Sequence, residues 1–400
     1  MQTAKFPAID SANTRWLILA MLFACRTGLG FQFQALGSVS SQLVDQLGFN
    51  YAEIGTLIGL FMLPGLVLSL PVGYAGRYLA DRTLVSLGLS SLALGGALAA
   101  VAHGFGLLAL GRIAAGAGFV VSTIYFTKMV ADWFAGRELA TAMGVLVASW
   151  PVGIAMGQIG HVWIAANYDW RMAFVVAAVY CVVGAVAVML FYQAPPRAPG
   201  AAAMPAAVAF SLPRNELTLT LLAASVWGLF NAGYIVYLSF APRVLMAGGY
   251  GATQAAAVIS IASWVMILSI GIGGQIADRT GKRDLVIYVG AATAVVSVLL
   301  LREVSIAIWL SLAFGLVGMA SAGVIMALTG EAMAPQRRAF GMGVFFSGYF
   351  VIMTAAPPIA GWLYDRSGDP YVSVQFAAGL FTAAALANWA FRQVKKRIAA

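Results

Sequence analysis

The chain has 400 residues, of which 62% are hydrophobic and 9% are charged, and its formal net charge is +9 at pH 7. This composition excludes a soluble globular protein, because so few charged side chains cannot form the polar surface that a core of this size requires. The positive charge does not indicate nucleic-acid binding, since the basic residues are spread over short segments between apolar runs.

Apolar runs of about 20 residues, the length that spans a bilayer as a helix, recur along the whole sequence. They predict an all-α polytopic membrane protein with twelve transmembrane helices. The expected spans are 16–38, 52–75, 84–102, 107–131, 139–165, 171–192, 217–240, 253–276, 285–301, 305–329, 339–362 and 372–391.

The twelve spans divide into two sets of six. A segment rich in Pro, Ala and Gly follows the sixth span and has no helical periodicity, which is typical of a linker. Met143-Gly-Val145 and Met342-Gly-Val344 open the fifth and the eleventh span, so the two sets are predicted to be duplicated, pseudo-symmetric halves. We expect an N-terminal six-helix half at 1–192, a cytoplasmic linker at 193–215 and a C-terminal six-helix half at 216–400. Parallel repeats of this kind are a transporter architecture, with the substrate site between the halves.

The basic residues set the expected orientation. Most of them fall in segments on the side of the two termini, which the positive-inside rule places in the cytoplasm. We therefore expect a multi-pass protein of a bacterial-type inner (plasma) membrane with both termini cytoplasmic. The two His and two Cys have no neighbouring acidic cluster, so neither an enzyme nor a metal or other cofactor is expected.

Arg26 lies about ten residues into the first span, where a charged side chain costs about 2.5 to 3.5 kcal/mol. At 100° per residue, Arg26, Gly30 and Gln34 share one helix face. All 14 acidic residues fall in predicted loops or at helix ends, so none is placed to neutralise Arg26. The counter-ion that we expect is a small anionic substrate, because a guanidinium binds a planar carboxylate through two parallel hydrogen bonds. A snorkelling or structurally paired arginine remains the alternative.

Other polar residues of the spans are weaker candidates for the same site. Arg112, in the fourth span, either supports the positive potential or has a structural role. Asn231 and Tyr234 share one face of the seventh span and offer hydrogen-bond donors, as Gln34 does from the first.

Three motifs carry a resemblance that covers essentially the whole chain. The stretch Gly274-Gln-Ile-Ala-Asp278-Arg279-Thr-Gly281-Lys282-Arg283 resembles the G-x-x-x-D-R-x-G-[RK]-[RK] loop of the major facilitator superfamily. Gly111-Arg112-Ile-Ala-Ala-Gly116-Ala-Gly118 is similar to the family's motif of an arginine followed by glycines. Ser149-Trp150-Pro151-Val-Gly153-Ile-Ala-Met-Gly157 resembles a Pro/Gly-rich segment of the family and, more loosely, its organic-anion and cyanate- or nitrate-like porters.

The resemblance implies alternating access, with a conformational latch formed by Gly274, Asp278, Arg279, Gly281 and Arg283. The equivalent first-half loop departs from the pattern, since Arg77 stands where the family has Asp.

The sequence therefore predicts a secondary active or facilitative transporter of a small carboxylate or inorganic anion, working as a monomer in the lipid bilayer without a nucleic-acid partner. Without a carboxylate in the spans, uniport or anion exchange is expected, or a proton that travels on the substrate. The alternative function is proton-coupled efflux of drugs or metabolites, for which an acidic residue within the membrane would be expected.

Overall fold

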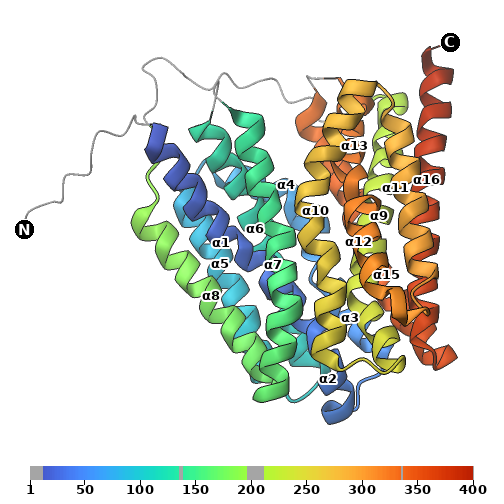
Figure 1. The fold of residues 1–400 in the computed structure, drawn as a ribbon. Coiled ribbons are helices and arrows are strands. Elements are labelled where there is room, and N and C mark those ends of the chain that lie inside the picture. The colour runs from blue at the N-terminus through green and yellow to red at the C-terminus, as the bar shows by residue number, and fades with distance from the viewer. Residues whose placement is uncertain (1–11, 135–137, 196–210, 335–336, 400) are drawn as a thin grey trace, which may run out of the picture.

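The computed structural model describes residues 12–134, 138–195, 211–334 and 337–399. Within these ranges all regular structure is helical, and the chain runs back and forth along one direction (Figure 1). Much of the predicted linker, 196–210, lies outside the described residues.

Eight helices precede the linker and are called here the first bundle. They are α1 (Ala12–Ser38), α2 (Ser40–Leu47), α3 (Tyr51–Leu60), α4 (Pro64–Ala75), α5 (Asp81–Ala100), α6 (Phe105–Trp133), α7 (Leu139–Asn167) and α8 (Trp170–Phe191).

The helices after the linker are called the second bundle. They are α9 (Arg214–Ala247), α10 (Ala252–Thr280), α11 (Arg283–Leu299), η1 (Val304–Ile306), α12 (Ala307–Leu316), η2 (Gly318–Ser321), α13 (Ala322–Met326), α14 (Leu328–Ala332), α15 (Arg338–Ser367) and α16 (Pro370–Ala399).

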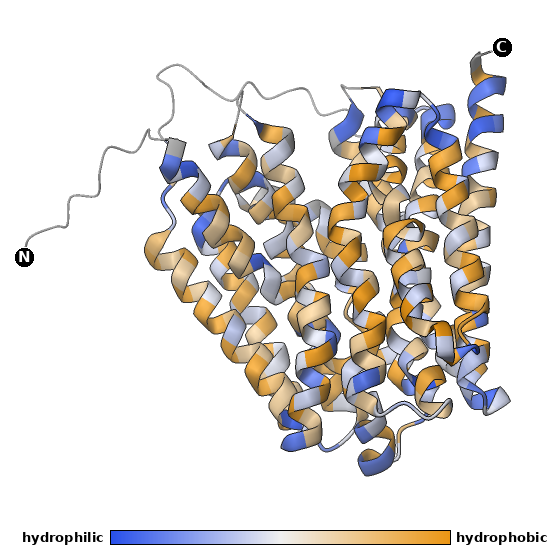
Figure 2. Cartoon of the chain, in the orientation of Figure 1, coloured by the Kyte–Doolittle hydropathy of each residue, from blue (hydrophilic) through white to orange (hydrophobic). Residues whose placement is uncertain are grey.

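In the part of the chain that the structure describes, 11 helical stretches are long and apolar enough to cross a membrane. The remaining predicted span is α11, which has 17 residues and runs alongside α16 (Figure 1). Hydrophilic residues gather at the two ends of the helices, and hydrophobic ones cover their length (Figure 2). The prediction of a twelve-helix all-α membrane protein is confirmed.

Two crossings that the sequence predicts as continuous are interrupted. The second breaks between α3 and α4, just before Pro64, which lacks the N–H that a helix interior requires. Gly116 of α6 makes room for this break, because a Cβ there would lie 2.1 Å from the backbone oxygen of Phe61. The tenth crossing is divided into α12, η2, α13 and α14.

Both described ends of the chain lie at the same end of the helices, which we call the terminal side; the other end is the opposite side (Figure 1). The first bundle contacts the second mainly through α3 and α4 against α15, and α7 against α10. Gln158 of α7 also donates a 3.1 Å hydrogen bond to the backbone oxygen of Leu238 in α9.

Inside the first bundle, α1 and α7 cross in backbone contact. A Cβ on Gly30 would lie 2.4 Å from the backbone oxygen of Trp150, and one on Gly153 would lie 2.2 Å from that of Thr27. Small residues allow such close packing of membrane helices. This crossing fixes α7 against the helix face that carries Arg26.

Candidate functional site

Arg26 lies in the middle of α1 and is buried, with 8% of its surface exposed. Its Nη1 donates 2.8 Å hydrogen bonds to the backbone oxygen of Leu146 and to Oγ of Ser149, both in α7. These acceptors lie in α7 within about one and a half turns before Pro151, which has no backbone N–H. The Nε of Arg26 is buried without a hydrogen-bond partner. One guanidinium nitrogen therefore makes two hydrogen bonds, and another has no partner among the described residues.

Arg112 of α6 is still more deeply buried, at 1% exposure. Its Nε donates to the backbone oxygen of Leu57 in α3 at 3.1 Å, and its Nη2 donates to that of Phe33 in α1 at 3.3 Å. The guanidinium carbon lies 4.6 Å from the centre of the Phe61 ring, a cation–π contact. Arg112 thus ties three helices together, while its Nη1 has no hydrogen-bond partner.

Among the residues that the structure describes, neither arginine has an acidic partner. No Asp or Glu is among the buried residues of the described ranges, which contain every acidic residue except Asp10. The salt bridges of the described residues do not include Arg26 or Arg112. An unpaired buried charge is costly, so a mobile anion remains the physical candidate for the missing partner.

Gln34 completes the predicted polar face of α1, and like Arg26 and Gly30 it contacts α7. Its Nε2 donates to Oγ of Ser38 at 3.3 Å, and Ser38 donates to the backbone oxygen of Gly157 at 3.2 Å. Arg26 and Gln34 therefore lie on one side of α1, about 12 Å apart along its axis.

The two candidates from α9 are held within the second bundle. The side-chain amide of Asn231 donates to the backbone oxygen of Trp227, one turn earlier in the same helix, at 2.8 Å. The hydroxyls of Tyr234 and Ser263 share a 2.7 Å hydrogen bond, and Tyr234 is 2% exposed. No described hydrogen bond joins either residue to Arg26, so their part in binding stays a prediction.

The predicted latch lies at the terminal side of the second bundle. Gly274 and Asp278 belong to α10, and the turn comes later, at Gly281, whose φ of +68° favours glycine. The Asp278 side chain is 74% exposed, and its one described ion pair is with Arg283, 3.5 Å away. Arg279 is also exposed. In this structure the described contacts of Asp278 stay within the second bundle.

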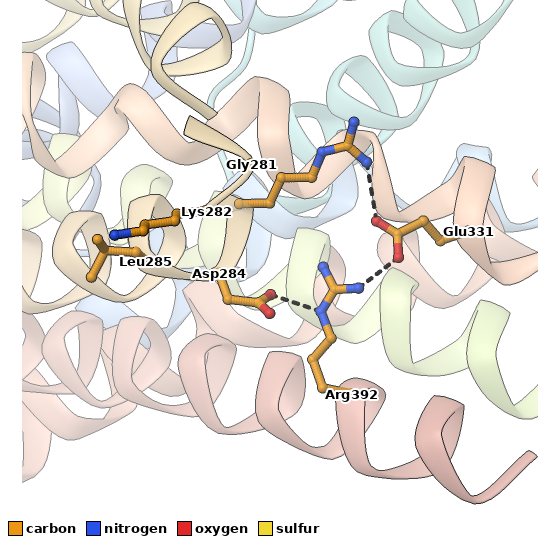
Figure 3. Close-up of a pocket in the computed structure, with 7 residues that line it drawn as sticks. Gly281, Lys282, Asp284, Leu285, Glu331 and Arg392 are labelled. Atoms are coloured by element: carbon orange, nitrogen blue, oxygen red, sulfur yellow. Dashed lines mark hydrogen bonds and ion pairs between the residues drawn. The ribbon is translucent and has the colours of Figure 1, made fainter. Parts of the chain in front are cut away.

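A charged cavity of about 400 Å³ adjoins this motif (Figure 3). Arg392 of α16 donates to Asp284 at 2.7 Å and to Glu331 at 2.5 Å. Arg283 pairs with Glu331 at 3.4 Å. This network connects α11, α14 and α16 of one bundle, and so stabilises the second bundle itself.

Sequence reasoning missed a contact on the opposite side. Asp365, near the end of α15, accepts hydrogen bonds from the backbone N–H groups of Tyr51 and Ala52 at the start of α3. The acid is separated from its donors by more than 300 residues and belongs to the other bundle. No local sequence signal reveals this pairing.

Comparisons with known proteins agree with this architecture. The sequence model described as Major Facilitator Superfamily matches residues 22–333. The hexuronate transporter of Bacillus subtilis (strain 168) is 26% identical over 388 residues, covering 88% of this chain and 89% of that protein. The probable L-galactonate transporter of Escherichia coli (strain K12) is 26% identical over 149 residues, 37% of this chain and 33% of that protein. A solved bacterial homolog of the human lysosomal transporter Spinster has a TM-score of 0.72 at 16% identity, with 97% of this chain and 96% of that one covered.

The contacts of Arg112 generate a stability prediction. Arg112→Lys should lower the free energy of unfolding by about 1.5–3 kcal/mol, because a single ammonium cannot replace hydrogen bonds from two guanidinium nitrogens to two helices. Thermal unfolding in detergent without ligand measures this loss. Arg366→Lys is the control, since Arg366 is exposed against Trp362. Equal unfolding temperatures for parent and Arg112→Lys would contradict the structural role.

Proposed function

Because this chain belongs to the Major Facilitator Superfamily, and its relatives are transporters rather than enzymes, we propose that it transports a small organic anion bearing a carboxylate. The observation that carries the proposal is that Arg26 and Arg112 are buried and have no acidic partner among the described residues, where each also has a guanidinium nitrogen without a hydrogen bond. A bound carboxylate supplies both the charge and the acceptors.

The names of the relatives support a substrate class. The full-length relative is a hexuronate transporter and the partial one a probable L-galactonate transporter. Both names denote sugar acids, which combine one carboxylate with several hydroxyl groups. We therefore assign sugar acids as the substrates, with Arg26 as the main carboxylate-binding residue.

The remaining candidates have supporting roles in this proposal. Arg112 contributes positive potential from a fixed position, while Gln34, Asn231 and Tyr234 hydrogen-bond to hydroxyl groups when the bundles close around the substrate. The halves at 1–192 and 216–400 move against each other about this site. The chain acts as a monomer in a bacterial-type inner membrane, with the terminal side in the cytoplasm.

The substrate class is tested on purified protein with matched ligands. Glucuronate, galacturonate and galactonate should raise the unfolding temperature, whereas glucuronamide, which keeps the ring and loses the charge, should not. Nitrate, cyanate and a cationic dye complete the panel. A preference for the dye would reject the anion proposal and favour the efflux alternative.

Two substitutions of Arg26 should show how much of substrate binding depends on its positive charge and how much on its planar pair of donors. Arg26→Lys keeps the charge but loses the planar pair of donors, so binding should weaken. Arg26→Ala should weaken it at least about 30-fold, because loss of a charge-assisted pair at a buried site costs about 2 to 5 kcal/mol.

Equilibrium binding of radiolabelled glucuronate to detergent-purified variants measures this effect. Arg15→Lys is the control on the same helix, since Arg15 pairs with Glu138 on the terminal side. If the affinity and the transport rate of Arg26→Ala lie within about threefold of the parent's values, Arg26 has a structural role and does not bind the substrate.

The lack of a buried carboxylate among the described residues leads to a mechanistic prediction. Exchange of labelled for unlabelled sugar acid should proceed in vesicles with the same pH on both sides, because alternating access needs only differential binding to two states. Counterflow that requires a pH gradient, and that a single Asp or Glu substitution uncouples, would show that the protein itself carries the proton.

The motif around Asp278 is proposed as the latch of the terminal side, engaged when that side is closed. Asp278→Asn should then favour the state open at the terminal side and slow transport, while substrate binding survives. Single cysteines on the terminal-side ends of α7 and α10 should react faster with a polar maleimide. Asp278→Glu, which keeps the charge, is the control, and unchanged reactivity in Asp278→Asn would argue against a latch.

A further inference from the structure

The start of α3 is completed by a residue from the other bundle. A helix N-terminus leaves its first backbone N–H groups without partners inside the helix. In α3, Asn50 accepts from Glu53 at 2.8 Å, as a helix cap. Asp365 accepts from Tyr51 at 2.8 Å and from Ala52 at 2.7 Å. The second bundle therefore supplies a carboxylate to the positive end of a first-bundle helix.

The side chain of Tyr51 strengthens the same contact. Its ring stacks on Tyr364 of α15, with centres 3.9 Å apart and planes 7° apart. The guanidinium of Arg243, in α9, lies 4.5 Å from the centre of the Tyr51 ring and donates to its hydroxyl. Three side chains of the second bundle thus hold one residue of the first.

The backbones of α3 and α15 also touch at Tyr51 and along the first turn of α3. A Cβ on Gly361 would lie 1.8 Å from the backbone oxygen of Tyr51, and one on Gly55 would lie 2.1 Å from that of Pro357. The contact therefore requires the two helices to be fully closed against each other at the opposite side.

We propose that Asp365 is a positioning residue of the transport cycle, which keeps the opposite side closed by binding the N-terminus of α3 and must release it for that side to open. The contact joins the two bodies that alternating access moves apart. In the same structure Asp278, on the terminal side, pairs within its own bundle. A carboxylate thus links the bundles on one side, whereas on the other side the described ion pair of Asp278 stays within the second bundle.

The linkage has no counterpart at the symmetry-related place. The end of α7 corresponds to the end of α15 in the repeat, and Ala165, Ala166 and Asn167 stand there without an acidic residue. Asn167 donates to Trp163 of its own helix. Loss of Asp365 alone should therefore change the equilibrium between the two access states.

The proposal goes beyond the proposed function and does not depend on which substrate is carried, so its first test measures distances in the protein without any ligand. Cys25 and Cys181 are first replaced by alanine. Spin labels at Tyr168→Cys and Glu303→Cys then report the distance between the bundles on the opposite side, and labels at Arg82→Cys and Arg397→Cys report the terminal side. All four positions are exposed.

In Asp365→Asn, molecules with a long label-to-label distance on the opposite side should become more frequent. The ratio of this open population to the closed one should rise by about tenfold, and the distance between the terminal-side labels should shorten in the same molecules. Asp365→Glu should restore part of the closed population. Asp369→Asn is the matched control, because Asp369 accepts from Tyr371 at the start of α16 within one bundle and should leave the distances unchanged.

In transport assays, Asp365→Asn should change the maximal transport rate more than the affinity for the substrate. Arg243→Gln, which removes the contact with the Tyr51 ring, provides a second variant with the same expected shift if Asp365→Asn is poorly expressed. Distance distributions equal to the parent's in the expressed variant would overturn the proposal. A shift of equal size in Asp369→Asn would overturn it as well.

Discussion

The guanidinium groups of Arg26 and Arg112 are buried and have to find hydrogen-bond acceptors among the surrounding helices, and this constraint links the helices of the first bundle. Backbone oxygens are the acceptors that a helix bundle can supply without burying a second charge. Arg112 uses those of Leu57 and Phe33, and Arg26 uses that of Leu146 together with Ser149. These bonds connect α1, α3, α6 and α7. Because backbone oxygens carry no full charge, these hydrogen bonds do not neutralise either arginine.

Glycines make these helix contacts possible and also fix where the bundles meet. Gly30 and Gly153 bring α1 and α7 into backbone contact, which places the acceptors of α7 beside Arg26. Gly55 and Gly361 do the same for α3 and α15, across the boundary between the bundles. The first contact lies within the first bundle, and the second lies between the two bundles, so the same type of glycine contact occurs in both places.

Carboxylates at helix starts show a similar division. Asp169 and Asp369 accept from the first turns of α8 and α16, and each lies next to the helix that it caps. Asp365 makes the same type of contact with α3, but it comes from the other bundle. A helix cap within one bundle stabilises a turn, whereas a cap supplied across the boundary stabilises one arrangement of the two bundles.

The sequence by itself determined the membrane class, the twelve crossings and the family resemblance, because span length, hydropathy and short motifs are local properties of the chain. It also identified Arg26 and Arg112, since a charge within an apolar run is visible without a structure. It did not predict the breaks before Pro64 and within the tenth crossing, which depend on how neighbouring helices pack. The partners of the two arginines and the pairing of Asp365 with the start of α3 were decided by the tertiary structure alone. These contacts join residues between 55 and 314 positions apart, and which backbone oxygen or N–H group lies within reach depends on how the helices cross.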